Sequence, residues 1–195
     1  MTGTPIRALS SFDVKNKFVA AFNYNLPFGR GQAIGGQWNR VVDGLVAGWQ
    51  VNGILTAQSG LPFSVYATSS AQCGCSSGGL RAELIGNPFP AGFHQSIDQW
   101  FDPAAFSDPP PEQYGNSGRN IIAGPGLTDL DFSLFKKFQL GEKRMLQVRG
   151  EYFNILNHSN FLHPTSTTDA TWNTGGILTQ TMPARVGQLA LKFIF

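Results

Sequence analysis

The last eleven residues, 185–195, read RVGQLALKFIF, and their side chains alternate in character. One set of alternate positions is apolar (Leu189, Leu191, Phe193 and Phe195), whereas the other begins with Gln188 and includes Lys192. A period of two places the two sets on opposite faces of a β-strand. At about 3.3 Å per residue the stretch spans about 33 Å, enough to cross the roughly 25 Å apolar band of an outer-membrane barrel when tilted. The apolar set is therefore predicted to be the C-terminal signal of a transmembrane barrel, although a water-soluble sheet shows the same alternation.

Four further segments repeat this design, at residues 17–28, 45–68, 128–138 and 145–155. With 185–195 they predict an all-β fold, an antiparallel transmembrane β-barrel segment of about five strands. Two connections are long, 69–125 and 156–184, and two are shorter, 29–44 and 140–143. Because outer-membrane barrels have short periplasmic turns and long extracellular loops, we expect the long connections to lie outside the cell.

The same orientation gathers aromatic residues at the periplasmic rim of the predicted barrel. Rings favour a membrane interface, and Lys136 or Lys137 at that rim would snorkel toward water. The aromatic residues are Tyr24, Phe28, Trp49, Phe138, Phe193 and Phe195.

Composition excludes two classes of protein. The 195 residues are 13% charged with a formal net charge of +2, and the basic residues are scattered. No electrostatic footprint for nucleic acid is present, so we expect no nucleic-acid partner. No stretch approaches the roughly 20 apolar residues of a spanning helix. The mean hydropathy of −0.10 is compatible with a barrel, whose strands are apolar at only every second position.

Polar residues collect on the second face of the predicted strands. In a water-soluble sheet this face would be solvated, whereas in a barrel it would line the lumen, with opposite charges paired across strands. The residues in question are Asp129, Asp131, Gln147, Arg149, Glu151, Gln188 and Lys192.

Catalytic chemistry has no support in the sequence. There is no G-x-S-x-G elbow, and the glycine-rich stretch at 29–36 lacks the Lys-Ser/Thr of a phosphate loop. His158 and His163 lack the additional ligands that a metal site needs. Cys73 and Cys75 could chelate a soft metal or oxidise together, and an exported protein favours a local disulfide. We therefore expect no enzyme activity, no metal and no cofactor.

Several segments together resemble the C-terminal barrel strands of TonB-dependent outer-membrane receptors, and most closely the Oar-like branch, whose members carry an N-terminal carboxypeptidase-regulatory-like domain. The resemblance covers residues 18–195 and rests on NYNLPFGRG (23–31), GWQVNGILTAQSGLPFSV (48–65), WFDPAAF (100–106), YGNSGRNIIAGPG (114–126), DLDFSLFKKF (129–138) and LQVRGEYFNILNHSNF (146–161).

The resemblance implies a plugged barrel of about 22 strands, of which this chain supplies about five. It implies an outer-membrane transporter or receptor in contact with lipid, an energy-coupling TonB complex acting through an N-terminal part that this chain lacks, and barrel-assembly machinery reading the last strand. Residues 1–16 contain no secretory signal, so we expect the chain to be a fragment. Trp100, Phe101 and Tyr114 in the long connection are the expected substrate contacts.

Two alternatives remain open from the sequence. The first is a secreted antiparallel β-sandwich that binds glycan or protein through exposed aromatic residues. The second is a barrel assembled from several copies of this chain through its unpaired edge strands.

Overall fold

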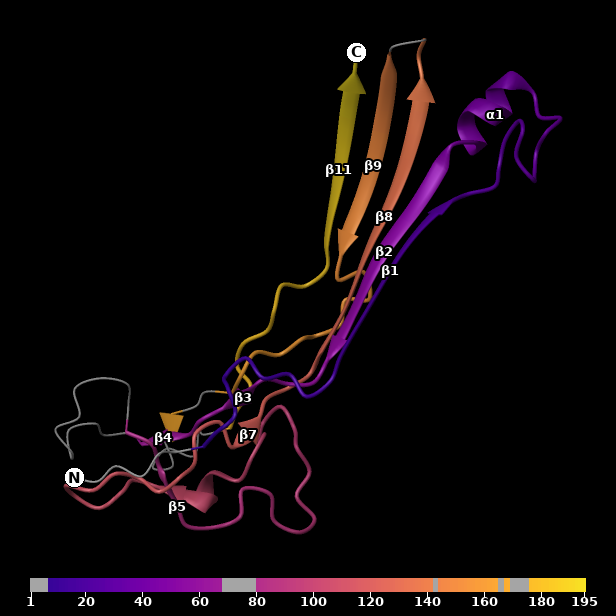
Figure 1. Ribbon diagram of the computed structural model, residues 1–195. Helices are drawn as coiled ribbons and strands as arrows, with labels where there is room; N and C mark the ends of the chain where they lie inside the picture. The colour runs from indigo at the N-terminus through magenta and orange to yellow at the C-terminus, as the bar shows by residue number, and fades with distance from the viewer. Residues whose placement is uncertain (1–6, 68–79, 142–143, 165–166, 169–175) are drawn as a thin grey trace. The chain divides into compact units, whose positions relative to one another are not determined.

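The computed structural model describes residues 7–67, 80–141, 144–164, 167–168 and 176–195. Within these ranges the regular secondary structure is almost entirely β-strand (Figure 1). The main sheet contains β1 (Lys17–Asn25), β2 (Trp49–Gln58), β8 (Leu127–Gln139), β9 (Met145–Phe153) and β11 (Val186–Ile194). The shorter elements are α1 (Arg40–Val46), β3 (Pro62–Phe63), β4 (Tyr66–Ala67), β5 (Glu83–Leu84), η2 (Pro103–Ala105), β6 (Phe106–Ser107), β7 (Ile122–Ala123) and β10 (Thr167–Thr168). None of the helices in the described ranges is long and apolar enough to cross a membrane.

The chain divides into two units, each with its own contacts. The strand unit comprises residues 18–57, 128–159 and 183–195, which hold the long strands. The loop unit comprises residues 1–17, 58–127 and 160–182, which are mostly the two long connections of the sheet.

The strand unit is one five-stranded sheet in the order β1-β2-β8-β9-β11. Its strands alternate in direction, as Figure 1 shows for β8, β9 and β11. The Leu26 N–H donates to the Trp49 oxygen at 2.9 Å between β1 and β2, and the Lys137 N–H donates to the Gly48 oxygen at 3.5 Å between β2 and β8. The predicted antiparallel fold with five strands is confirmed. Among the described residues the sheet is open, because β1 and β11 each have one neighbour.

The register brings the apolar positions of neighbouring strands onto one face. Three rows cross β8, β9 and β11 there: Leu134–Gly150–Leu189, Lys136–Val148–Leu191 and Phe138–Leu146–Phe193. We call this side the apolar face and the opposite side, which holds Arg149 and Glu151, the polar face. The core cluster of buried hydrophobic residues lies in the loop unit, and many apolar side chains of the sheet are exposed. The two-layer packing that a soluble sandwich requires is not seen in the strand unit.

Aromatic rings on the apolar face lie over glycines of the adjacent strand. A Cβ atom at Gly53 would come within 2.4 Å of the Phe22 ring, and one at Gly187 within 2.9 Å of the Tyr152 ring. Each ring therefore covers backbone that a glycine leaves bare, and the two glycines fix the cross-strand register by shape.

The strand predicted at 45–68 begins later and ends earlier than expected. Leu45 and Val46 form the last part of α1, which begins after the N-cap Asn39; the Asn39 Oδ1 accepts the Val42 N–H at 2.9 Å. Gly48, with φ of +75°, then turns the chain into β2. The apolar alternation of 45–49 is too short to outweigh this capping bond, so the prediction was wrong there. The other strand boundaries lie within three residues of the predicted ones.

The long connection 69–125 is not an irregular loop where it is described. Short strand pairs β3–β7 and β5–β6 hold it together, with Phe63 opposite Ile122 and Leu84 opposite Phe106. A hydrophobic core fills the loop unit, formed by Phe63, Val65, Ala82, Phe101, Ala105, Phe106 and Ile122. This core was not predicted from the sequence. The apolar residues that form it are dispersed among prolines and glycines and show neither the strand period nor the helix period.

Replacing Phe101 by alanine should destabilise the loop unit by about 3–5 kcal/mol, because its side chain is fully buried and packs edge-on against Phe106 at 5.6 Å between ring centroids. Hydrogen exchange across 80–127 would report the loss. The control Tyr114→Ala, at a side chain that is 71% exposed, should stay within about 0.5 kcal/mol. Equal protection in both variants would contradict the core assignment.

Candidate functional site

The centre of the polar face holds a bonded group of polar side chains from β9 and β11. The Arg149 guanidinium and the Glu151 carboxylate form an ion pair at 3.1 Å along β9. The Gln188 amide donates to the other Glu151 oxygen at 2.5 Å across to β11. The Arg149 guanidinium also lies 4.7 Å from the centroid of the Phe135 ring on β8. The contacts thus run from Phe135 on β8 through Arg149 and Glu151 on β9 to Gln188 on β11.

The remaining polar positions extend this group along the same face. Lys192 lies opposite Gln147 in the register of β9 and β11. The Asp131 Oδ1 accepts the Asn154 N–H at 3.1 Å, so that carboxylate closes the turn after β9. The Asp129 Oδ1 is buried and accepts no hydrogen bond in the structure.

A second polar group, which the site prediction did not include, lies on β1 and β2. The Gln50 amide donates to the Asn23 Oδ1 at 2.8 Å and to the Asn52 Oδ1 at 3.2 Å. In the sequence these residues already occupy the polar positions of their strands. They were not predicted as site residues because they are uncharged. The polar face therefore carries uncharged amides at the β1 side and the Arg149–Glu151 ion pair toward the β11 side.

A recess of about 250 Å³ opens at the α1 end of the strand unit. Its polar lining comes from Asn25, Gln32, Gln50 and Lys137, and its apolar lining from Leu26, Phe28 and Trp49. Amides dominate the polar lining, which suits a hydrogen-bonding group better than a metal ion.

Lys136 occupies an unexpected place in the same part of the sheet. By register it belongs to the apolar face, yet its side chain is 2% exposed. The ammonium donates to the carbonyl oxygens of Leu45 at 2.8 Å and Ala47 at 2.5 Å, at the C-terminal end of α1. It also lies 5.0 Å from the ring centroids of both Trp49 and Phe138. Of the two lysines predicted to snorkel at the rim, Lys136 does not reach water, because backbone carbonyls and aromatic faces satisfy its charge instead, whereas Lys137 is exposed.

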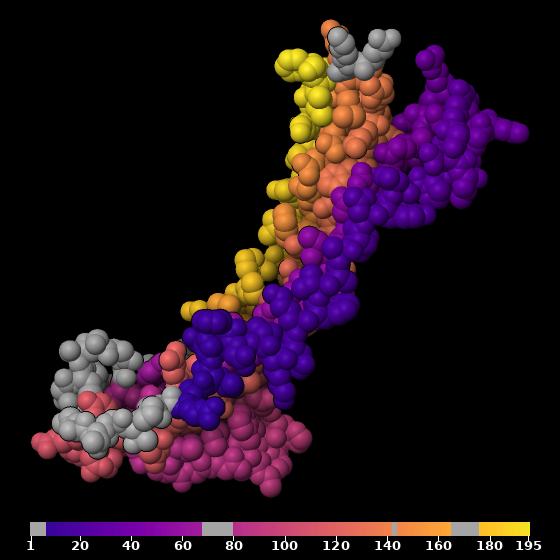
Figure 2. All heavy atoms as spheres, in the orientation of Figure 1, coloured from indigo at the N-terminus to yellow at the C-terminus, as the bar shows by residue number. Residues whose placement is uncertain are grey.

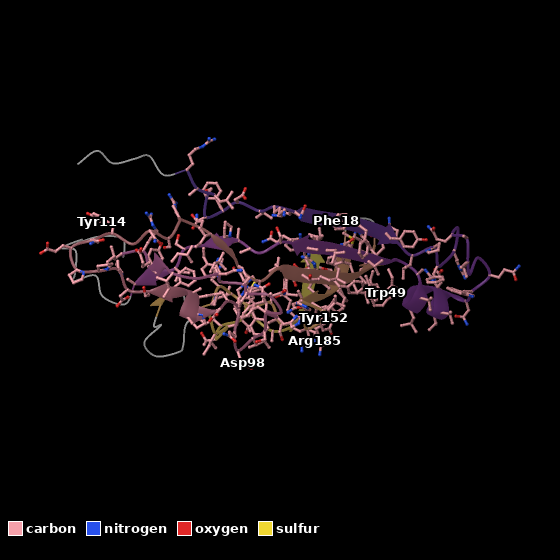
Figure 3. All side chains as sticks on the ribbon, turned by 90° about the horizontal axis from the view of Figure 1, so that it is seen from below. Phe18, Trp49, Asp98, Tyr114, Tyr152 and Arg185 are labelled. Carbon is pink, nitrogen blue, oxygen red and sulfur yellow. The ribbon has the colours of Figure 1, made fainter. Side chains whose placement is uncertain are left out.

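The three residues predicted to contact substrate lie in different environments within the loop unit. Phe101 is fully buried in the hydrophobic core, so the prediction that it contacts substrate at the surface is wrong. Trp100 packs against that core and donates its indole N–H to the Ala123 oxygen at 2.8 Å. Tyr114 is exposed, and Figure 3 shows it labelled on the loop unit. Of the three, only Tyr114 has a largely exposed side chain.

The apolar residues of the last strand are uncovered. Leu189 is 86% exposed and Phe195 is 91% exposed, and the Phe193 and Phe195 rings stack with centroids 6.0 Å apart. Figure 2 shows β11 (yellow) at the surface of the strand unit. A water-soluble protein would not leave such a strand in contact with solvent.

Metal and thiol chemistry is not seen in the part of the chain that the structure describes. Among those residues no group of three or more His, Cys, Asp or Glu could hold a metal ion. Cys73 and Cys75, the predicted disulfide, lie outside the described residues.

Comparison with known families identifies the class. The model of the family described as outer membrane beta barrel domain matches residues 4–188, nearly the whole chain. The chain therefore belongs to the outer membrane beta barrel domain family, and the protein is located in the bacterial outer membrane. Neither a curated protein nor a solved structure matches it.

Replacing Lys136 by methionine should lower the free energy of unfolding by about 2–3 kcal/mol, because two carbonyl oxygens lose a charged donor. Urea denaturation in detergent micelles would measure the change. Lys137→Met is the matched control, since that neighbouring side chain is exposed, and it should change stability by less than about 0.5 kcal/mol. A similar loss in both variants would show that general charge, rather than the bonds of Lys136, stabilises this region.

Proposed function

We propose that this chain forms part of the barrel wall of a TonB-dependent outer-membrane receptor of the Oar-like branch, which takes up or binds a substrate at the cell surface. The observation behind this proposal is the division of the sheet across β8, β9 and β11 into an apolar face and a bonded polar face. In outer-membrane barrels apolar residues face lipid and polar residues face the interior. The family match fixes the outer-membrane class, and the sequence resemblance suggests the finer assignment.

In this role the polar face lines the lumen. Arg149, Glu151 and Gln188 form a fixed network there, so their first role is to hold neighbouring strands in register. Lys192 and Gln147 lie opposite each other in the next row and present polar groups toward the interior. The polar face can therefore do two things. The network of Arg149, Glu151 and Gln188 holds the strands together, and Lys192 and Gln147 contact whatever fills the lumen.

The unpaired outer edges of β1 and β11 indicate that the complete barrel contains more than these five strands. Backbone groups in hydrocarbon need partners, and the outer edges of β1 and β11 would expose a row of them. Five strands are also fewer than the eight of the smallest bacterial barrels. We propose that further strands of a longer receptor pair with both edges and close a barrel of about 22 strands around a plug.

The connections assign the two ends of the barrel wall. The turn between β8 and β9 is short, whereas β2–β8 and β9–β11 are joined by the long connections that build the loop unit. Short turns are periplasmic and long loops extracellular in this class, so the loop unit is the part that a substrate meets first. Its exposed Tyr114 is the best candidate contact, because a ring with a hydroxyl suits ligand recognition.

The proposed partners follow from the same arrangement. Outer-membrane lipid contacts the apolar face, an energy-coupling complex acts through other parts of the receptor, and barrel-assembly machinery recognises β11. The chain itself catalyses no reaction and needs no cofactor or nucleic acid in this role.

Replacing Leu191 by lysine should destabilise the protein in phospholipid vesicles by about 2–4 kcal/mol, because the residue lies on the apolar face near the middle of β11. The matched variant Gln188→Lys places the same charge on the polar face beside Glu151 and should be mild. Denaturant titration of vesicle-bound protein compares them. Equal losses would contradict the assignment of the faces to lipid and lumen.

Uptake provides the functional test. In cells that express the full-length receptor, Tyr114→Ala should lower the accumulation of the transported compound while the amount of receptor in the outer membrane stays constant. Dissipating the proton-motive force should abolish accumulation for every variant. Accumulation that survives the loss of this energy source would refute energy-coupled transport, whereas an unchanged rate in Tyr114→Ala would remove only the proposed contact.

A further inference from the structure

We propose that α1 and the segment before it lie in the periplasmic lipid interface, with Ile34, Val41 and Leu45 inserted among the lipid acyl chains. The helix would thus anchor the barrel wall in the plane of the membrane. This inference rests on the proposed contact of the apolar face with lipid, and extends it beyond the strands.

The C-terminal end of α1 is bonded to residues of the apolar face. The Trp49 indole N–H donates to the Leu45 oxygen at 3.0 Å, and the Lys136 ammonium donates to the oxygens of Leu45 and Ala47. Lys136 lies in the same row as Val148 and Leu191 of the apolar face. Trp49 shares this side because its ring contacts the Lys136 ammonium, and Figure 3 shows it near the helix. The helix end therefore adjoins the surface that meets lipid.

Apolar side chains of this segment have no cover. Val41 is 71% exposed, Leu45 is 64% exposed and Ile34 is 49% exposed. Val41 and Leu45 are four residues apart, so they lie on one side of the helix. At a rim that faces water these apolar side chains would stay exposed and contribute no stabilisation. A lipid surface would bury them, which is favourable.

The polar groups of the segment are mostly satisfied within it. The Asp43 carboxylate accepts the Arg30 N–H at 2.7 Å, and Asn39 caps the helix. The Arg30 guanidinium donates to the Trp38 oxygen at 3.0 Å. Arg40 is exposed beside the apolar side chains, where a cation suits a lipid phosphate.

Aromatic residues complete an interfacial pattern. The Phe28 and Trp38 rings lie with centroids 6.5 Å apart, and the Trp38 ring packs against Gly35, which has φ of +96°. Tryptophan is enriched where membrane and water meet, because its ring is apolar and its N–H is polar.

Lipid fits this surface better than a protein partner. A stable protein interface buries about 800 Å² on each side, which three aliphatic side chains cannot supply. The patch is also continuous with the apolar face, through the bonds of Trp49 and Lys136 to the helix end. In-plane helices need no defined partner surface, only an apolar side and nearby cations.

The test measures the depth of single fluorescent labels in vesicles. The whole chain, with Cys73→Ser and Cys75→Ser, receives one cysteine by Leu45→Cys, Val41→Cys, Gln37→Cys or Leu191→Cys, and each is labelled with an environment-sensitive dye. The labelled proteins are reconstituted into phosphatidylcholine vesicles brominated either close to the headgroup or deep in the acyl chain. Quenching is compared with that by aqueous iodide.

Labels at positions 41 and 45 should be quenched by shallow bromines at least about twofold more than the label at the exposed control position 37. The label at position 191 should respond to deep bromines, which reports insertion of the sheet independently. If position 191 inserts but 41 and 45 respond only to iodide, the anchor is overturned while the barrel proposal survives. If no position responds to bromine, both the anchor and lipid contact of the apolar face are overturned.

Discussion

The structure depends on one constraint: a peptide N–H or C=O group in hydrocarbon must find a partner inside the protein, because no water is available. β2, β8 and β9 meet it by pairing on both sides. Each strand then presents alternate side chains to two different surroundings, and the rows across β8, β9 and β11 keep those side chains in register. Glycines are tolerated in this sheet because Phe22 and Tyr152 cover Gly53 and Gly187. Pairing and alternation thus act together, and loss of register would place polar groups among lipids.

At the end of the sheet next to α1, side chains rather than strand pairing provide partners for backbone groups. A helix C-terminus leaves carbonyl groups without partners, and the Lys136 ammonium and the Trp49 indole satisfy those of Leu45 and Ala47. A positive charge is favourable at this end of a helix, and two aromatic faces surround it. Lys136, although it lies on the apolar face, therefore joins α1 to the sheet through its hydrogen bonds.

The loop unit has its own source of stability. The residues of its hydrophobic core cluster come from the β2–β8 connection, and the short pairs β3–β7 and β5–β6 satisfy backbone groups locally. A connection with a core can present an ordered surface, while its exposed residues, such as Tyr114, can vary without disturbing the sheet. This separation suits a protein whose strands cross the outer membrane.

The sequence by itself determined the five strands and their two faces, because a period of two is a local property that any extended chain converts into sidedness. It also brought Arg149, Glu151 and Gln188 to one face. Only the tertiary structure decided that Phe101 is core rather than contact, that residues 40–46 are helical, and that Lys136 is buried. The burial of Phe101 and Lys136 depends on partners distant in the chain, Phe63 for Phe101 and Leu45 for Lys136, and no local pattern encodes such contacts.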